Sequence, residues 1–227
     1  MKKVIILGLL TLIFIPNPTI AQSVSLINIM NLDSLDGASV AVGDLGEDGV
    51  AEIVIGSGFG VPPEVKIFRQ DGSLINSFLA YDKNFNRGIQ VALGDVDGDG
   101  VNDIITAPAY GGGPHIRVFD SYGNLHNEFF AYNPAFRGGA FVTARDVNDD
   151  GKAEIITGAG PTGGSHVRVF QADGTLLHEF FAFEPGDISG VTVGAITIDG
   201  QVHILAGRAS SDPPTIKVFT PEGKEKI

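Results

Sequence analysis

The feature that most constrains this chain is a repeat of about 51 residues. A short apolar segment containing an Asp occurs three times and places Asp44, Asp95 and Asp146 at intervals of 51 and 51 residues. A second signature, in which apolar and basic residues alternate, occurs four times, at intervals of 51, 51 and 49 residues, and ends at Phe68, Phe119, Phe170 and Phe219. A fixed period of this length indicates one supersecondary unit that is copied along the chain.

Each copy has the pattern of four short β-strands. In the second copy the segments cover residues 89–96, 103–107, 115–120 and 125–132. β-Branched and aromatic residues fill these segments, and Gly, Pro and Asn separate them. No long stretch has a helical period. Four strands per copy suit a propeller blade, so we predict an all-β fold: a β-propeller of about four blades, each a four-stranded antiparallel sheet.

The repeats predict the boundaries of the blades. They cover approximately residues 32–82, 83–133, 134–184 and 185–227. The fourth repeat ends where its last strand should begin, whereas residues 25–30 lie in the register of the last strand of the first repeat. We therefore predict that Ser25 to Met30 complete the fourth blade and close the ring, which removes an open sheet edge. Two alternatives stay open: a piece of a longer propeller, or two four-blade chains that associate into a larger ring.

The N-terminus has the pattern of a secretory signal peptide. Lys2 and Lys3 precede twelve apolar or small residues at 4–15, and Ala21 precedes the expected cleavage site. An apolar run of this length is too short to span a bilayer, which requires about 20 residues. We expect residues 1–21 to be removed, residues 22–227 to form the propeller, and the mature protein to be secreted, in the periplasm, at the cell surface or outside the cell.

Charge and cysteine content narrow the classes of partner. The net charge is −12, and loss of Lys2 and Lys3 with the signal peptide makes it −14. Such an acidic protein repels nucleic acid, and no membrane span is expected in the mature chain. The sequence has no Cys, so a divalent metal is the obvious substitute for disulfides in a secreted protein.

The loop after the first strand of the second repeat has the pattern of a calcium site. Side-chain oxygens occupy its positions 1, 3, 5 and 9, at Asp95, Asp97, Asp99 and Asp103, and the carbonyl of Val101 is available at position 7. Oxygen ligands in this number suit Ca²⁺ better than Mg²⁺. Without a cation the carboxylates would repel one another. Both flanks are strand-like, so we expect a metal-binding hairpin and not an EF-hand.

The other repeats keep this pattern to different degrees. The third loop keeps it fully, with Asp146, Asn148, Asp150, the Lys152 carbonyl and Glu154. The first loop has Gly46 at position 3, so that a water must replace one ligand beside Asp44, Asp48, the Val50 carbonyl and Glu52. The fourth repeat has Ala195, Thr197, Asp199 and His203 at the corresponding places and should bind no metal. We therefore expect two or three Ca²⁺ ions.

These motifs resemble a known family. The stretch Gly-Asp-Val-Asp-Gly-Asp-Gly-Val-Asn-Asp at 94–103, followed by Gly-Gly-Gly-Pro-His-Ile-Arg-Val-Phe at 111–119, is similar to the FG-GAP and VCBS-type repeats of bacterial surface proteins and of integrin α subunits. The resemblance covers nearly all of residues 25–227. It implies a propeller with calcium in the hairpin between the first two strands of a blade. Integrins have seven such repeats, so the resemblance does not carry over integrin ligands.

Other features of the repeats suggest packing and not catalysis. His115 and His166 recur at one repeat position without a nucleophile beside them. The aromatic runs at 129–132 and 180–183 recur on the fourth strand, which favours packing between blades, while Tyr110 and Tyr122 are expected to be exposed.

We therefore expect a non-catalytic binding, adhesion or structural module, monomeric or self-associating as a half-ring, whose ligand is a protein or glycan outside the cytoplasm. The alternative is a polysaccharide-active, lyase-like enzyme or a glycan-binding lectin on the same scaffold. An enzyme needs a cluster that breaks the repeat. The fourth repeat offers one candidate, formed by Asp199, His203, Arg208 and Asp212.

Overall fold

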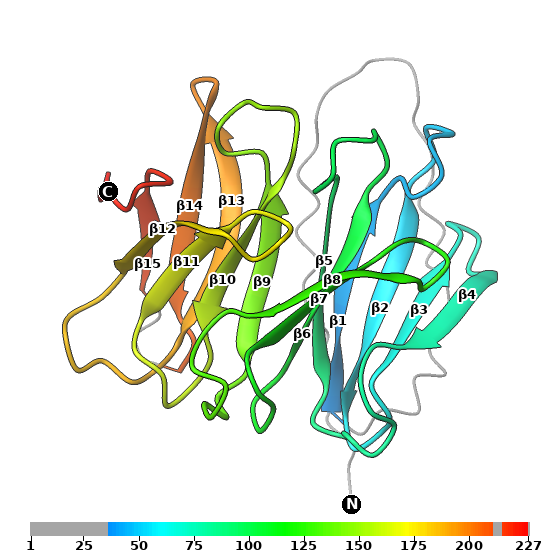
Figure 1. Ribbon diagram of the computed structural model, residues 1–227, viewed down its shortest axis with the longest axis horizontal. Coiled ribbons are helices and arrows are strands. Elements are labelled where there is room, and N and C mark those ends of the chain that lie inside the picture. Colours follow the sequence, from blue (N-terminus) through cyan, green and yellow to red (C-terminus); the bar gives the residue numbers. More distant parts are fainter. Residues whose placement is uncertain (1–35, 211–214, 227) are drawn as a thin grey trace, which may run out of the picture.

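The computed structural model describes residues 36–210 and 215–226. Its β-strands form four antiparallel sheets, which lie side by side as the blades of a β-propeller (Figure 1). The first three sheets have four strands each and the fourth has three. The first sheet contains β1 (Asp36–Gly43), β2 (Glu52–Phe59), β3 (Glu64–Phe68) and β4 (Leu74–Leu79). The second contains β5 (Ile89–Gly94), β6 (Asp103–Pro108), β7 (His115–Phe119) and β8 (Leu125–Phe130). The third contains β9 (Ala140–Arg145), β10 (Glu154–Ala159), β11 (His166–Phe170) and β12 (Leu176–Phe181). The fourth contains β13 (Val191–Ile198), β14 (Gln201–Arg208) and β15 (Ile216–Phe219).

Successive sheets pack face to face. The first strand of each sheet contacts the first strand of the next, β1 with β5, β5 with β9 and β9 with β13. β6 and β10 are buried along their whole length, because both of their faces meet a neighbouring sheet. Three apolar clusters fill the three junctions between sheets. The core therefore lies between blades, which explains why the same apolar positions recur in every repeat.

A glycine in the hairpin between the third and fourth strands lets each blade approach the preceding one closely. Gly123 has φ 87° and Gly174 has φ 85°, a region that favours glycine. A Cβ on Gly123 would lie 2.7 Å from the ring of Phe78, and one on Gly174 would lie 2.7 Å from Phe129. A side chain at these positions would therefore separate the blades as well as strain the turn.

The predicted fold class is confirmed: the described chain is all-β, and its strands form four propeller blades. The strands of the second repeat agree with the prediction to within two residues at their ends. The fourth sheet has three strands in the described residues, as expected for a blade whose last strand is not contiguous with it. The strand predicted at 25–30 and the signal peptide predicted at 1–21 lie outside the described residues. Within those residues, no helix has the length and apolar character needed to cross a membrane.

Candidate metal centre

Three hairpins between the first and second strands of a blade share one hydrogen-bonding scheme. The acid at position 1 accepts the amide N–H of the glycine at position 6, at 2.8 Å for Asp44, 2.9 Å for Asp95 and 2.9 Å for Asp146. The other oxygen of the same carboxylate accepts a further amide earlier in the loop. Each loop is thus wrapped around the carboxylate of its first residue.

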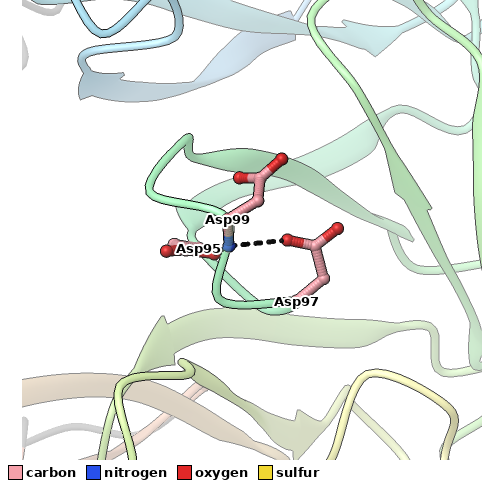
Figure 2. Close-up of side chains that lie close together, drawn as sticks. All are labelled: Asp95, Asp97 and Asp99. Carbon is pink, nitrogen blue, oxygen red and sulfur yellow. Dashed lines mark hydrogen bonds between the residues drawn. The ribbon is translucent and has the colours of Figure 1, made fainter.

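Two residues of each loop have a positive φ, in the left-handed region of backbone conformation. The residues at position 6 have φ between 77° and 94°, and they are Gly49, Gly100 and Gly151. The residues at position 4 do the same with φ between 55° and 81°, and they are Glu47, Gly98 and Asp149. Glycine relieves the strain at position 6 in every loop. In the second loop the resulting turn leaves the side chains of positions 1, 3 and 5 close to one another (Figure 2).

The second loop brings three of its predicted ligands together. Asp95, Asp97 and Asp99 each offer a carboxylate oxygen, and the three oxygens lie within 4.8 Å of one another (Figure 2). Asp97 also accepts the amide N–H of Asp99 at 3.1 Å. Within residues 36–210 and 215–226, no other trio of acidic or His side chains meets this spacing. Hard oxygen donors at this distance fit a cation of the Ca²⁺ type.

The acid at position 9 lies deeper than the others and binds the backbone at position 2. Asp103 accepts the amide N–H of Val96 at 3.1 Å, and Glu154 accepts that of Val147 at 2.9 Å. Glu52 accepts the corresponding N–H of Leu45 at 2.9 Å. Only 6% of Asp103 and 2% of Glu154 is exposed.

This burial changes the proton affinity of both acids. Burial, with a smaller contribution from the charges of Asp97 and Asp99, raises the pKa of Asp103 to about 6. Burial raises the pKa of Glu154 as well, and Asp150 and Asp146 add to the effect. In contrast, backbone hydrogen bonds lower the pKa of Asp44. A cation in the loop would oppose the shifts of Asp103 and Glu154 by offsetting the negative charge that surrounds them.

The remaining predicted ligands lie in the same loops. The side chain at position 5 accepts the amide N–H of position 7 in each loop, at 2.8 to 2.9 Å. The pairs, acceptor first, are Asp48 with Val50, Asp99 with Val101, and Asp150 with Lys152. Asn148, at position 3 of the third loop, donates its side-chain N–H to Glu154 at 2.8 Å. Position 3 of the first loop is Gly46, whose Cβ would meet nothing within 4 Å, so there is room for a water there. Metal coordination by these residues stays a prediction.

The fourth blade has a different connection at this place. β13 and β14 are joined by a two-residue turn, with Asp199 at φ 51° and Gly200 at φ 77°. Positive φ at both central residues is the geometry of a type I′ hairpin. Ala195 and Thr197 pair directly with Ile204 and Val202 in the ladder, so this segment forms regular strand where the other repeats form a loop.

The repeated His residues pack against the fourth strand of their own blade. His115 stacks on Phe130, with ring centroids 4.5 Å apart, and lies 3.2 Å from Glu128. His166 makes the same contacts with Phe181 and Glu179, at 4.5 Å and 3.0 Å. These contacts agree with the packing role that the sequence indicates.

Only some of the aromatic residues on the fourth strands pack between blades. Phe129 contacts Phe170 at 4.9 Å across a junction, as predicted, whereas Phe130 is 48% exposed and Phe181 is 61% exposed. Tyr110 and Tyr122 are exposed, as expected.

The sequence pattern did not indicate that these exposed rings line hollows. A hollow of about 490 Å³ lies at the junction of the first two blades and is lined by the loop at 111–113, Phe130, His115 and Arg137. A second hollow of about 330 Å³ repeats this arrangement around Phe181 and His166. Exposed aromatic rings beside cationic side chains can bind planar or sugar rings.

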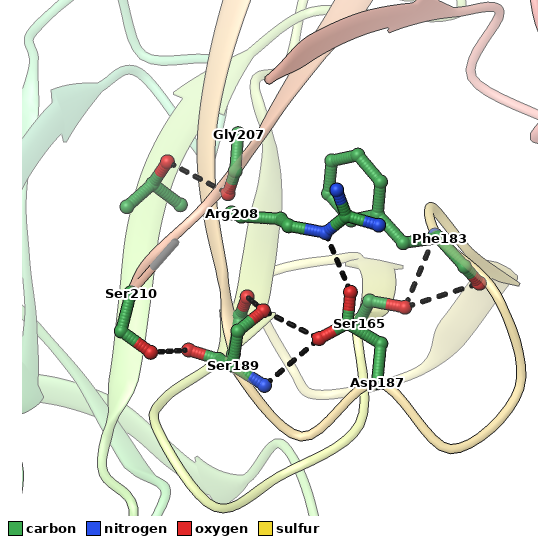
Figure 3. A network of polar contacts seen from close by, with 9 residues as sticks. Ser165, Phe183, Asp187, Ser189, Gly207, Arg208 and Ser210 are labelled. Atoms are coloured by element: carbon green, nitrogen blue, oxygen red, sulfur yellow. Dashed lines mark hydrogen bonds and ion pairs between the residues drawn. The ribbon is translucent and has the colours of Figure 1, made fainter. Parts of the chain in front are cut away.

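The described members of the candidate cluster in the fourth repeat do not converge. Asp199 lies in the turn before β14 and His203 lies near the beginning of β14, whereas Arg208 lies at the end of β14, about 17 Å beyond His203 along an extended strand. Arg208 donates to Asp187 at 2.6 Å and lies over the ring of Phe183 at 4.4 Å (Figure 3). Two hydrogen bonds from Ser189 and the bond from Arg208 lower the pKa of Asp187 to about 2. This network ties the fourth blade to the third, while Asp212 lies outside the described residues.

The comparisons with known proteins support the repeat and the fold. The FG-GAP repeat model matches residues 87–118. These residues include the candidate metal loop of the second blade, β5, β6 and most of β7, so the resemblance to FG-GAP repeats is confirmed at this repeat. No curated protein sequence matches this chain.

Three rhamnogalacturonan lyases are among the solved structures that this chain resembles in fold. The exotype lyase YesX shares 15% identity with this chain at a TM-score of 0.57, lyase YesW shares 15% at 0.55, and the Bacillus licheniformis lyase PL11 shares 19% at 0.56. The matches cover 83 to 84% of this chain and 40 to 42% of the lyases. The chain thus spans about two fifths of their length, and at this identity the likeness concerns the fold.

Proposed function

We propose that this chain is a secreted, calcium-binding propeller module that binds a protein or glycan without catalysing a reaction. The observation that carries the proposal is the group of oxygens from Asp95, Asp97 and Asp99, which lie within 4.8 Å of one another in a loop that is repeated in two further blades. Repetition favours a structural role for the metal, because a catalytic ion needs one site with an open coordination position. The signal sequence expected at residues 1–21 supports export.

Calcium would act by stabilising the folded state. An ion that binds only the folded protein stabilises it by about 2.7 kcal/mol at a hundredfold excess over its Kd. Three such loops would provide a large part of a net stability of about 5 to 15 kcal/mol. A chelator should therefore lower the melting temperature of the purified protein markedly, and added calcium should restore it. An unchanged melting temperature in chelator would rule out this role.

A glycan is the ligand class that the hollows between blades favour. The exposed ring of Phe130 and the guanidinium of Arg137 line one hollow, and Phe181 and His166 line its repeat. Stacking on an aromatic ring, with hydrogen bonds from neighbouring polar side chains, is a common way to hold sugars. The fold that the chain shares with rhamnogalacturonan lyases points to the same ligand class.

A glycan array, probed with and without calcium, tests this second proposal. Binding that is lost in Phe130→Ala and Phe181→Ala but kept in Tyr122→Ala, a control exposed on a hairpin tip, would support it. Cleavage of a bound polysaccharide, detected as newly formed unsaturated sugar, would instead favour the alternative of a lyase-like enzyme.

A further inference from the structure

One uncovered surface lies on the fourth sheet. At one position of the third strand, Val65, Ile116 and Val167 pack in the junction with the following blade, and Ile216 has the same register in the fourth sheet. The first three are 0% exposed, whereas Ile216 is 70% exposed. Leu205 and Val218, on the same face, are half-buried, although the equivalent residues in the other blades are buried. Among residues 36–210 and 215–226, nothing comparable to a following blade therefore covers this face of the fourth sheet.

A second uncovered surface lies on the first sheet, on the face directed away from the second blade. Val40 is 48% exposed and Val42 is 59% exposed, whereas Val91, which is equivalent to Val40, is 6% exposed. Phe68 is half-buried, whereas Phe119 and its equivalents are 3 to 4% exposed. Ile55, in the centre of this face, is buried. In the part of the chain that the structure describes, the first sheet therefore lacks most of the cover that a preceding blade provides elsewhere.

The two open surfaces are the two halves of one repeating junction. In each of the three junctions of this chain, the face of one sheet that is equivalent to the open face of the fourth sheet packs on the face of the next sheet that is equivalent to the open face of the first sheet. The surface that fits the open face of the fourth sheet is thus the open face of a first sheet. Among the described strands, no contact comparable in extent to that of β1 with β5 joins β1 to β13. Figure 1 shows the two sheets at opposite ends of the array.

We propose that a second copy of this chain covers both surfaces. The fourth sheet of each copy packs on the first sheet of the other, which creates two identical junctions and continues the blade-to-blade packing around a closed pair. A two-fold axis relates the two junctions, because the fourth sheet of each copy contacts the first sheet of the other, so the pair is a closed isologous dimer. The proposal does not depend on calcium or on the proposed ligand, because none of the residues that carry it belongs to a metal loop or to a hollow.

The mass of the purified chain from Gln22 in solution, measured by light scattering and sedimentation, tests the proposal. The expected mass is twice that of the chain. Ile216→Asp on the fourth sheet and Val42→Asp on the first sheet should each weaken association by at least about tenfold, because each places a charge in an apolar junction. Tyr122 is 81% exposed on a hairpin of the second blade, so Tyr122→Asp is the matched control and should stay dimeric. Circular dichroism checks that the variants are folded.

Mixing the two variants distinguishes this arrangement from other dimers. A mixed pair has one junction with both substitutions and one junction with neither, so an equimolar mixture should recover dimers that neither variant forms alone. A contact between two fourth sheets would respond to Ile216→Asp alone and gain nothing from mixing, which would overturn the proposal. A monomer at all concentrations, or an open-ended polymer of copies, would overturn it as well.

Discussion

Asp103→Asn is expected to change the stability of the protein in opposite directions with and without calcium. The carboxylate is 6% exposed in the second metal loop, and its pKa is raised to about 6. In calcium we expect the carboxylate of Asp103 to bind the ion, so replacing this carboxylate destabilises the protein. In chelator the same charge is buried without a cation, so its removal stabilises the protein.

The size of the effect without metal follows from the pKa of Asp103. Its value in the folded state, about 6, lies above the ordinary value of 3.8, so the folded protein holds the proton more tightly than the unfolded chain does. The penalty is fully present above pH 6 and disappears as the pH falls from about 6 toward 3.8. One pKa unit corresponds to about 1.4 kcal/mol, so the buried charge costs about 3 kcal/mol at neutral pH. The new amide needs hydrogen-bond partners of its own, at a cost of about 1 kcal/mol or more, which leaves a net gain of up to about 2 kcal/mol.

Thermal melts at neutral pH, in excess calcium and in chelator, measure this reversal. For a chain of this size, 1 kcal/mol shifts the melting temperature by about 2 to 4 °C, so the variant should melt up to about 8 °C higher than the parent in chelator. In calcium the variant lacks a site that provides about 2.7 kcal/mol but keeps its gain of up to about 2 kcal/mol, so it should be about 0.7 to 2.7 kcal/mol less stable than the parent and melt about 1 to 11 °C lower. Asp71→Asn removes one charge from an exposed hairpin and should shift both melts equally. If Asp103→Asn destabilises the protein equally in both media, its carboxylate serves only the hydrogen bond to Val96, and the assignment of the loop is wrong.

Further predictions concern the other loops and the junctions. Asp97→Ala and Asp150→Ala should each lower the melting temperature by about 5 to 10 °C in calcium and by much less in chelator, as scanning fluorimetry can show. Calcium titration by calorimetry should give two or three sites, whereas four sites of similar affinity would contradict the absence of a site from the fourth hairpin. The gain in melting temperature from calcium should shrink between pH 7 and 5, because protons compete for Asp103, whose pKa is about 6. Phe129→Ala should lower the free energy of unfolding by about 2 to 4 kcal/mol with or without calcium, because it removes a ring from a junction, and denaturant unfolding can measure this loss.

The sequence predicts the strands well because the turns are encoded locally. The β5–β6 and β7–β8 hairpins begin and end near the Gly and Asn residues that the repeat places there. The differences arise where the end of a strand serves another purpose. The sequence predicts strand at Val96, but the amide N–H of Val96 donates to Asp103 within the hairpin loop. Tyr132 was also predicted as strand, but it leaves the ladder and reaches the next blade, where its hydroxyl donates to the carbonyl of His166 at 2.8 Å.

The hollows between blades could not be predicted in the same way. Phe129 and Phe130 are adjacent and alternate between the two faces of β8, so one packs in a junction and the other does not. Whether the ring of Phe130 is covered depends on the angle between successive blades and on the loop at 111–113. A local sequence pattern predicts neither of these. The hydrogen bond between Arg208 and Asp187 could not be predicted either, because these residues are 21 positions apart in the sequence and do not occupy positions that the repeat conserves in type.

Contacts between successive hairpins explain why a metal in one loop would stabilise more than its own blade. The side chain of Asn102, in the second loop, donates to the carbonyl of Asp44 in the first at 2.8 Å. The amide of Ala153, in the third loop, donates to the carbonyl of Asp95 in the second at 2.6 Å. Each bond ends on the backbone of a position 1 residue, the residue around which its loop is wrapped. An ion that fixes this carboxylate also fixes the acceptor for the next blade, so the three loops form a continuous rim along one end of the array, and occupancy of one loop should make its neighbour more rigid.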